Sequence, residues 1–507
     1  MIDTAALREK VLDLAIRGKL VPQDPNDEPA SVLLERIHEQ KLQMVREGKL
    51  KAKDVKDDTI IFKGDDNCYY EKFSDGSVKN IQDEIPFDLP EGWGWARGKN
   101  CFQEMKTRKP NGEEFVYIDI DAIDNKKNTI TNAKALKVKD APSRACRYVE
   151  CGSVLFSLVR PYLKNIAFVE EKYASSIASS GFFVCTSTGV LYPRYSFYLM
   201  ISPYVVNGIN QFMKGDNSPS VSKSDIENWL YPIPPYNEQK QIVDCLNKIL
   251  AIIQNIHNTE NELQGEITSI KSKILELAIQ GKLVPQDEND EPASVLLERI
   301  RAERKAKLGK KYVESYIFKG DDNCYYENMP KNWVKCRLSD IADLERGITF
   351  SASAKETIKT KKNIACIRTA NVQDELDLDD LIYVDRAYTK NNERKLLRVG
   401  DIIMSSANSK ELVGKSCIVK HFDGEMTFGG FVLVIRSIQI IPEFLLICLK
   451  YLFLKGAFYN ESTQTTNIAN ISTKIIESLE ISLPPLMEQQ RIINKITTLF
   501  NILKDGV

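Results

Sequence analysis

The sequence predicts a mixed α/β (α+β) protein in which two α/β domains are separated by long antiparallel coiled-coil helices. Three repeats support this fold class, and each occurs once in each half of the chain. They are LREKVLDLAIRGKLVPQDPNDEPASVLLERI at 7–37 with a near copy at 270–300, FKGDDNCYYE at 62–71 and 318–327, and the segments IPPYNEQ at 233–239 and LPPLMEQ at 483–489. The segments between the repeats, roughly 95–230 and 333–480, look unrelated to each other. A duplicated scaffold with diverged inserts indicates two different surfaces presented in one fixed geometry.

The bulk composition is typical of a globular protein of several domains. The chain has 507 residues, of which 43% are hydrophobic and 27% are charged. Its 11 cysteines are scattered without a CxxC pair and it has only 3 histidines, so we expect neither a structural zinc site nor a disulfide framework. We also expect no membrane helix and no signal peptide, which makes the cytoplasm the expected location.

The net charge of −1 does not by itself indicate a nucleic-acid partner. Residues 96–230 carry 18 Lys or Arg against 13 Asp or Glu, a surplus of five, whereas residues 333–480 carry 20 against 19, a surplus of one. The scaffold is therefore acidic. A basic face on each insert is compatible with these totals, because net charge does not report patches.

A long helix is predicted from Ile242 onward. Apolar residues recur at alternating spacings of four and three over five heptads, with one interruption at Glu260. The stripe consists of Ile242, Leu246, Ile249, Ile253, Ile256, Leu263, Ile267, Ile270, Ile274 and Leu277. This a/d pattern is typical of a coiled coil, and the alternative is a long amphipathic helix in an ordinary core. Pro234 and Pro235 set its start, and Gly281 suits its C-terminal cap. About 40 residues would span roughly 60 Å.

The two chain ends carry a broken copy of this helix. Its first half is matched by Ile492, Ile496, Leu499 and Leu503, and its second half by Leu7, Val11 and Leu14. We expect the broken copy to pack antiparallel against the intact helix. The result would be a pseudo-twofold, circular arrangement.

A second helix is expected after each GKLVPQD segment, beginning near 27–29 and 290–292, because proline is common in a first helical turn. The two copies then differ in length. The segment from Ile37 to Ile61 is seven residues longer than the segment from Ile300 to Ile317. Seven residues correspond to about two helical turns, which would preserve the face of a longer helix.

Both inserts are predicted to be mixed α/β with many short strands. Each has a Gly-led apolar strand, at 152–158 and 400–405, followed by a loop with basic residues. Each closes on a polar turn, at 214–220 and 462–467. Such loops can bind phosphates through Arg and Lys and base edges through Asn, Gln, Ser and Thr, although a polar loop is more often only a solvated turn.

No catalytic or cofactor motif is found. Pro-Pro-Tyr at 234–236 differs from the [DN]PPY loop of adenine methyltransferases, because Ile233 stands where a carboxylate or amide is needed. There is no GxGxxG-type loop, and the GKS at 414–416 is not a Walker A motif, because Ser409 stands at the first glycine position. We therefore expect no catalytic residue, no metal and no cofactor in this chain.

Together these motifs resemble the specificity subunit of type I restriction–modification enzymes. The matching features are the LAI[RQ]GKLVPQD…NDEPASVLLERI repeats, LPEGW at 89–93, GSVLFSLVRPYL at 152–163, SKELVGK at 409–415 and the two PP..EQ helix starts. The resemblance spans essentially the whole chain. It implies a non-catalytic, DNA-binding chain whose two target-recognition domains each read one half of a bipartite sequence in double-stranded DNA.

The resemblance also implies partners and domain boundaries. Two methyltransferase subunits and motor–nuclease subunits would join the chain, and S-adenosylmethionine, ATP and Mg would belong to those partners. The implied boundaries are 1–70 and 233–328 for conserved helical regions, 84–232 and 329–483 for target-recognition domains, and 484–507 for a conserved C-terminal helix.

The residues expected to contact DNA are basic and polar side chains of the insert loops, together with one tyrosine. In the first insert they are Lys106, Arg108, Lys109, Arg160, Tyr162, Lys164, Lys214, Asn217 and Ser218. In the second they are Arg346, Thr349, Ser353, Lys355, Arg368, Lys410, Thr463, Gln464, Thr465 and Asn467. Two other functions stay open from the residues alone: a helical scaffold that assembles proteins without sequence-specific DNA binding, and a DNA methyltransferase in its own right.

Overall fold

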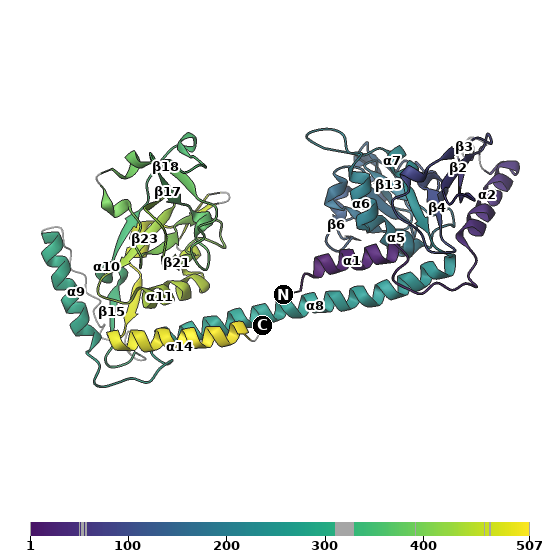
Figure 1. Ribbon diagram of the computed structural model, residues 1–507. Helices are drawn as coiled ribbons and strands as arrows, with labels where there is room; N and C mark the ends of the chain where they lie inside the picture. Colours follow the sequence, from purple (N-terminus) through teal and green to yellow (C-terminus); the bar gives the residue numbers. More distant parts are fainter. Residues whose placement is uncertain are drawn as a thin grey trace. The chain divides into compact units, whose positions relative to one another are not determined.

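The computed structural model describes residues 2–49, 51, 55, 58–309, 329–390, 392–460, 462–465 and 468–505. The chain divides into two compact units, Met1–Glu260 (unit 1) and Asn261–Val507 (unit 2). Each unit contains a mixed α/β insert and a pair of scaffold helices (Figure 1). The predicted mixed α/β class is therefore confirmed.

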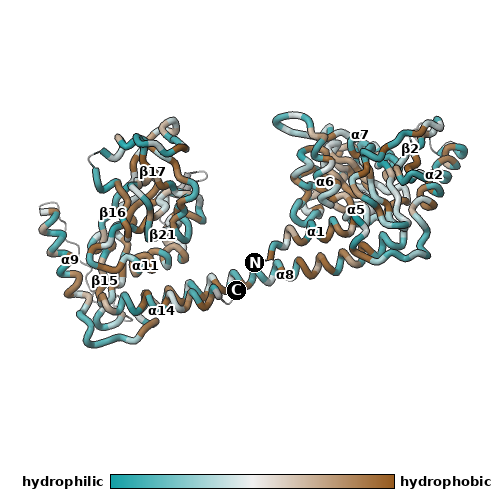
Figure 2. The backbone as a smooth tube through the Cα atoms, in the orientation of Figure 1, coloured by the Kyte–Doolittle hydropathy of each residue, from teal (hydrophilic) through white to brown (hydrophobic). Residues whose placement is uncertain are grey.

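The predicted long helix is α8 (Tyr236–Ile279), with 44 residues. It begins directly after Pro234 and Pro235 and ends just before Gly281, whose φ of +67° is the left-handed conformation expected of a C-terminal cap. Figure 2 shows hydrophobic and hydrophilic stretches alternating along α8, as expected of a helix with one apolar face. Within the predicted stripe Ile242 and Ile267 are buried, whereas Ile270 is exposed.

Each terminal helix packs antiparallel against one part of α8, as predicted for a broken copy. In unit 1, α1 (Thr4–Ile16) lies beside the first part: the Ile2 backbone N–H donates to Glu260 Oε1 at 2.8 Å, while Val11 and Leu12 share a core with Ile242. In unit 2, α14 (Leu486–Asp505) lies beside the second part, with Lys271 Nζ 5.6 Å from the centre of the Phe500 ring.

The predicted second helices are α2 (Ala30–Arg46) and α9 (Ala293–Leu308). They have 17 and 16 residues, so the seven extra residues of the first copy do not lengthen the helix by two turns. That expectation was wrong, because the extra residues follow the end of α2. After them, β1 (Thr59–Lys63), β2 (Tyr69–Phe73) and β3 (Val78–Asn80) form an antiparallel sheet. The repeat of β1 and β2 at 318–327 lies outside the described residues.

The insert of unit 1 packs short strands and helices around one core. Its elements are β4 (Gly94–Arg97), α4 (Gly98–Cys101), β5 (Glu114–Ile118), β6 (Ile123–Asp124), β7 (Thr129–Ile130), β8 (Lys134–Lys137), β9 (Ala145–Tyr148), β10 (Val154–Ser157), β11 (Ile166–Phe168), β12 (Ile177–Ser179), β13 (Phe182–Cys185), α5 (Pro193–Ile201), α6 (Pro203–Asn210), α7 (Lys223–Asn228) and β14 (Leu230–Ile233). The sheets have the orders β11-β10-β13, β8-β5-β12-β9, β14-β4 and β6-β7.

The insert of unit 2 is built in the same way. Its elements are β15 (Val334–Arg337), α10 (Leu338–Ile341), β16 (Ala342–Arg346), β17 (Asn363–Ile367), β18 (Ile382–Asp385), β19 (Ile402–Ser405), β20 (Ala407–Asn408), β21 (Ser416–Ile418), β22 (Met426–Phe428), β23 (Val432–Ser437), α11 (Pro442–Leu454), α12 (Ala457–Asn460), β24 (Thr463–Thr465), β25 (Ile468–Asn470), α13 (Thr473–Glu477) and β26 (Glu480–Leu483). The sheets have the orders β16-β23-β19-β21, β18-β17-β22, β15-β26 and β20-β25-β24.

The two inserts share a topology that their sequences do not reveal. In both, an antiparallel trio has the same connectivity, β11-β10-β13 in one and β21-β19-β23 in the other. In both, one parallel pair is formed, β5 with β12 and β17 with β22, next to an antiparallel neighbour, β8 or β18. The chain thus carries two copies of one fold whose loops differ.

Candidate DNA-recognition interface

Three short segments of unit 1, GKLVPQD, LPEGW and PP..EQ, meet at one junction at the base of the insert. Gln23 of GKLVPQD donates through Nε2 to Glu238 Oε1 at 3.2 Å, and Trp93 of LPEGW donates through Nε1 to Glu238 Oε2 at 2.9 Å. Glu238 lies in the first turn of α8. Its burial raises the pKa of the carboxyl above the usual value, although both hydrogen bonds act to lower that pKa. The junction therefore joins segments that are more than 200 residues apart.

Unit 2 forms the same junction. Gln286 Nε2 donates to Glu488 Oε1 at 2.7 Å, and Trp333 Nε1 donates to Glu488 Oε2 at 2.9 Å. Burial again raises the pKa of the glutamate. From the sequence alone, the PP..EQ motifs were predicted only to be helix starts. The recurrence of Gln, Trp and Glu in both copies was the signal that could have identified the junction.

Two glycines allow the junction to close. Gly18 has a φ of +65°, and a Cβ atom at this position would lie 2.3 Å from Pro90 Cγ. Gly281 has a φ of +67°, and its Cβ would lie at the same distance from Pro330 Cγ. Only glycine combines this backbone conformation with so close an approach. The GKLVPQD turn is therefore pressed against the segment that leads into each insert.

Each insert begins and ends at its junction through a pair of antiparallel strands. In unit 1, β4 pairs with β14, with Gly94 opposite Ile233. In unit 2, β15 pairs with β26, with Val334 opposite Leu483. The loops that connect the other strands of each insert are thus carried on a fixed base.

Two polar loops of the first insert lie side by side; we call them loop pair 1 and define it as residues 158–165 and 211–221. The Arg160 backbone N–H donates to Pro219 O at 2.8 Å, and its guanidinium Nη2 donates to Asn217 O at the same distance. A β-bridge joins Val159 to Ser220. Loop pair 1 thereby brings together five predicted contact residues, namely Arg160, Tyr162, Lys214, Asn217 and Ser218.

Lys164 belongs to the same loop, but its side chain turns toward the scaffold. Its Nζ lies 2.7 Å from Glu9 Oε1 on α1. Lys106, Arg108 and Lys109 lie elsewhere, on a segment beside β9. There Lys106 pairs with Glu150 at 2.5 Å, and the Arg108 guanidinium lies 5.2 Å from the centre of the Tyr148 ring.

The second insert has an equivalent arrangement, loop pair 2, which we define as residues 406–415, 462–465 and 468–470. Here β20 pairs with β25, so that Asn408 lies opposite Ala469, and β25 pairs with β24. Lys410 follows β20, and its Nζ lies 4.4 Å from the centre of the Tyr459 ring. Three predicted contact residues, Thr463, Gln464 and Thr465, form β24. Asn467 lies outside the described residues.

The remaining candidates of the second insert lie apart from loop pair 2 in sequence. Arg346 ends β16 and donates through Nε to Gly430 O at 3.2 Å. Thr349, Ser353 and Lys355 are exposed in the segment that follows. Arg368 forms an ion pair with Asp380 at 2.8 Å and also donates to its backbone oxygen. This pairing weakens the expectation that Arg368 binds phosphate.

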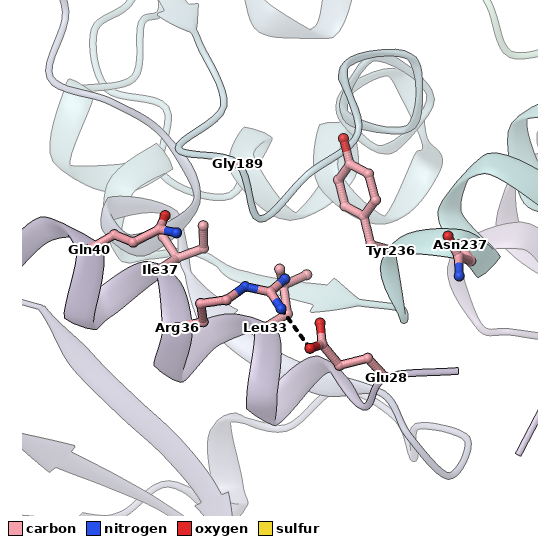
Figure 3. Close-up of a pocket in the computed structure, with 8 residues that line it drawn as sticks. All are labelled: Glu28, Leu33, Arg36, Ile37, Gln40, Gly189, Tyr236 and Asn237. Atoms are coloured by element: carbon pink, nitrogen blue, oxygen red, sulfur yellow. Dashed lines mark hydrogen bonds and ion pairs between the residues drawn. The ribbon is translucent and has the colours of Figure 1, made fainter. Parts of the chain in front are cut away.

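A cavity of about 370 Å³ lies in unit 1 between α2 and the start of α8 (Figure 3). Arg36 and Glu28 form an ion pair at its rim, 2.6 Å apart, and Tyr236 projects toward it. This lining contains no nucleophile with an adjacent base.

Among the described residues, no group of three or more His, Cys, Asp or Glu side chains is placed to hold a metal ion. No described helix is both long and apolar enough to span a membrane.

Comparison with known proteins supports the same interpretation. Residues 100–265 and 330–506 match the family model described as "Type I restriction modification DNA specificity domain". The chain is 27% identical to the type I restriction enzyme EcoEI specificity subunit of Escherichia coli, over 98% of this chain and 89% of that protein. It is 26% identical to the EcoAI specificity subunit of the same species, over 97% and 88%.

A solved structure from work on complex assembly and conformational transition of the type I R-M system has a similar fold. It superimposes with a TM-score of 0.58 at 24% identity, over 83% of this chain and 93% of that one. This likeness confirms the fold, while the family model and the two relatives confirm the predicted resemblance. Members of this family are non-catalytic and carry no cofactor of their own. The family model covers most of both inserts and more than half of the chain, and the chain therefore belongs to the DNA specificity subunits of type I restriction–modification systems.

Proposed function

We propose that loop pair 1 and loop pair 2 each read one half of a bipartite target in double-stranded DNA. The observation that carries this proposal is the contrast between the two inserts: they share an antiparallel trio, a parallel pair and the same junction, while the loops at equivalent places carry different side chains. Two inserts that share their strands and junction but differ in their loops are suited to bind two different half-sites. Arg, Lys, Asn, Gln, Ser and Thr supply the contacts, to phosphates and to base edges.

The domain boundaries given above belong to this proposal. The target-recognition domain at 329–483 contains both strands of its base, β15 and β26, and the domain at 84–232 contains β4 and all of β14 except Ile233. The helical regions 1–70, 233–328 and 484–507 then hold the two domains at a set spacing. If both half-sites lie on one face of the DNA, the distance between their centres is expected to be one helical turn, about 34–36 Å, or a multiple of it.

The decisive experiment is methylome sequencing of cells that express this chain with its cognate methyltransferase subunit. We expect a methylated motif of two unrelated halves separated by a fixed number of unspecified base pairs. Exchange of residues 84–232 for those of another specificity subunit should change one half and leave the other half unaltered. An undivided palindrome would contradict the proposal, and absence of sequence-selective binding by the assembled complex would favour a scaffold without DNA recognition.

We further propose that the duplicated helical regions dock two methyltransferase subunits, and that motor–nuclease subunits join this assembly. The first two turns of α2 and α9 support this proposal because both helices begin with ASVLLERI. Val32 is 45% exposed and Val295 is 44% exposed, at equivalent positions. Two equal exposed surfaces suit two copies of one partner.

The count of bound methyltransferase subunits tests this docking. Val32→Asp or Val295→Asp alone should reduce the complex from two methyltransferase subunits to one in native mass spectrometry, and the double variant should bind none. Val399→Asp is a suitable control, because Val399 is 67% exposed and lies in an insert. Retention of two subunits by the double variant would show that another surface is used.

A further inference from the structure

Two loops occupy the same place in the two inserts. The first connects β10 to β11 (residues 158–165), and the second connects β19 to β21 (residues 406–415). At their bases, the Ser157 backbone N–H donates to Asn165 O at 3.2 Å, and the Ser405 backbone N–H donates to Lys415 O at 2.9 Å. Each loop belongs to one of the loop pairs defined above. The two loops have different sequences, so a feature that both share does not follow from a common sequence.

The shared feature is an exposed leucine near the end of each loop. Leu163 is 40% exposed and Leu412 is 41% exposed. The Leu163 backbone N–H donates to Arg160 O at 2.9 Å, and the Leu412 backbone N–H donates to Ser409 O at 3.1 Å. Each leucine therefore closes a tight turn of the same kind, while its side chain is left out of the core. Folding therefore gains less from each of these leucines than from a leucine of the core, because about two fifths of the residue stays exposed.

Cationic side chains flank both leucines. Arg160 and Lys164 are near Leu163 in sequence, and Lys410 and Lys415 are near Leu412, where Glu411 is an acidic neighbour. Lys164 pairs with Glu9 and Lys415 donates to Gln373, so DNA would have to draw these two cations away from their present partners. An apolar tip between cations suits a DNA duplex, in which stacked bases lie between two rows of phosphates. A protein partner with a purely apolar surface would not be complementary to cations placed around the leucine.

Both loops are also held rigidly. Arg160 and Lys164 have left-handed backbone conformations, with φ of 48° and 54°, and Asn125 Nδ2 donates to Leu163 O at 2.9 Å. In the second loop, Gly414 has a φ of +87° and packs so closely on Phe458 that a Cβ atom would lie 2.3 Å from its ring. Left-handed residues other than glycine are uncommon and often occur at functional sites. A rigid turn can press its side chain against a partner without first becoming ordered.

We propose that Leu163 and Leu412 are wedge residues, each of which enters between two adjacent base pairs of its half-site and unstacks them. The inference rests on the proposed function and adds a distortion of the DNA to it. Inserted apolar side chains kink duplexes in other DNA-binding proteins, and flexible base steps then become part of the recognised sequence. Each insert would thus select its half-site by deformability as well as by base contacts.

The test uses the complete complex with its methyltransferase subunits and a duplex carrying the motif found by methylome sequencing. Unstacking is measured by 2-aminopurine fluorescence at adenines and permanganate reactivity at thymines, and the methylated adenine is left out. Wild-type complex should show one unstacked step in each half-site. Leu163→Ala should remove the signal from one half only, and Leu412→Ala from the other half only.

Conservative variants and a control make the result specific. Leu163→Phe should keep the unstacked step because it keeps an apolar wedge, and Val399→Ala should change nothing. Wild-type complex without unstacked steps, or alanine variants that retain them, would overturn the wedge while leaving sequence-specific binding intact. Loss of methyltransferase subunits from the Leu163→Ala complex in native mass spectrometry would also overturn it, since the leucine would then be a protein contact. Failure of the wild-type complex to bind the motif would instead refute the proposed function.

Discussion

Trp93 Nε1 donates a hydrogen bond to Glu238 Oε2 at 2.9 Å, which joins the segment that leads into the first insert to the first turn of the long helix α8. Trp333 and Glu488 form the same bond, at the same length, in the second unit. Both glutamates are 1% exposed, so the bond is shielded from water. The orientation of each insert on its helix therefore depends on one buried carboxylate.

Removal of this carboxylate should destabilise the junction. Glu238→Ala leaves the Trp93 indole N–H without its acceptor in a partly buried position, and we expect the free energy of unfolding of unit 1 to fall by about 1–3 kcal/mol. Chemical denaturation followed by tryptophan fluorescence measures this change. Glu35→Ala, at an exposed position on α2, is the control, and an equal effect of both substitutions would contradict the role of the junction.

The same carboxyl should make stability depend on pH. Burial raises the pKa of Glu238 above its usual value of 4.5 in the folded protein. Between 4.5 and that raised pKa, the folded state binds more protons than the unfolded state, so ionisation of Glu238 lowers stability as pH rises through this window. Glu238→Gln removes the effect. The free energy of unfolding of wild type minus that of the variant should therefore be larger at pH 4.5 than at pH 7, and a pH-independent difference would contradict this assignment.

The effect of the close approach at Gly18 on stability can be measured separately from the effect of its left-handed backbone conformation. Gly18 and Gly48 both have left-handed φ values, +65° and +71°, but a Cβ atom at Gly48 would meet nothing within 4 Å. Gly48→Ala should therefore cost only the strain of the backbone, roughly 1 kcal/mol. Gly18→Ala should cost clearly more, because its Cβ would collide with Pro90. Thermal unfolding of the two variants measures the difference, and equal shifts would show that the collision is relieved.

Glu9 should compete with DNA for Lys164. The pair is partly exposed, so breaking it should change stability by only about 0–1 kcal/mol. Glu9→Gln frees the ammonium for a phosphate, and the plot of log affinity against log salt concentration should become steeper by about 0.9. Titrations at several salt concentrations measure this slope. In a Lys164→Gln background, Glu9→Gln should have no further effect, and a change there would show that Glu9 acts on DNA directly.

Arg160 should affect one half of the target. Its guanidinium is held by Asn217 O at 2.8 Å, which leaves further N–H donors for DNA. If it contacts a base, Arg160→Ala should relax one position of one half-site by about 1–3 kcal/mol and leave the other half unchanged. Competition binding with single-base variants measures this. Lys172→Ala, on a surface lysine paired with Glu170, is the control.

The features predicted best from sequence are those specified by neighbouring residues. The start of α8 follows Pro234 and Pro235, and its end precedes Gly281, because proline and glycine act on the backbone locally. The spacing of the apolar residues predicted that this segment is a helix. The shared topology of the inserts was not predicted, because it depends on pairs such as Tyr117 with Ile177, which are 60 residues apart.

The candidate site was predicted in part for the same reason. The polar loops were found from their composition, but the packing of Arg160 against 217–219 required the fold. Composition also could not show that Lys164 faces Glu9, which lies 155 residues away, or that Arg368 is engaged by Asp380. Whether these residues contact DNA stays a prediction.

The antiparallel strands at the base of each insert have a consequence for the evolution of the chain. Gly94 lies opposite Ile233, so an insert leaves the scaffold where it joined it. FKGDDNCYYE recurs unchanged before the other insert, and the PP..EQ pattern recurs after it. Homologous recombination between these tracts would replace one insert by another without altering a single contact of the Trp93–Glu238 junction. New target sequences can then arise by exchange of whole inserts, at a rate set by crossing over and not by the slow accumulation of point mutations in the loops.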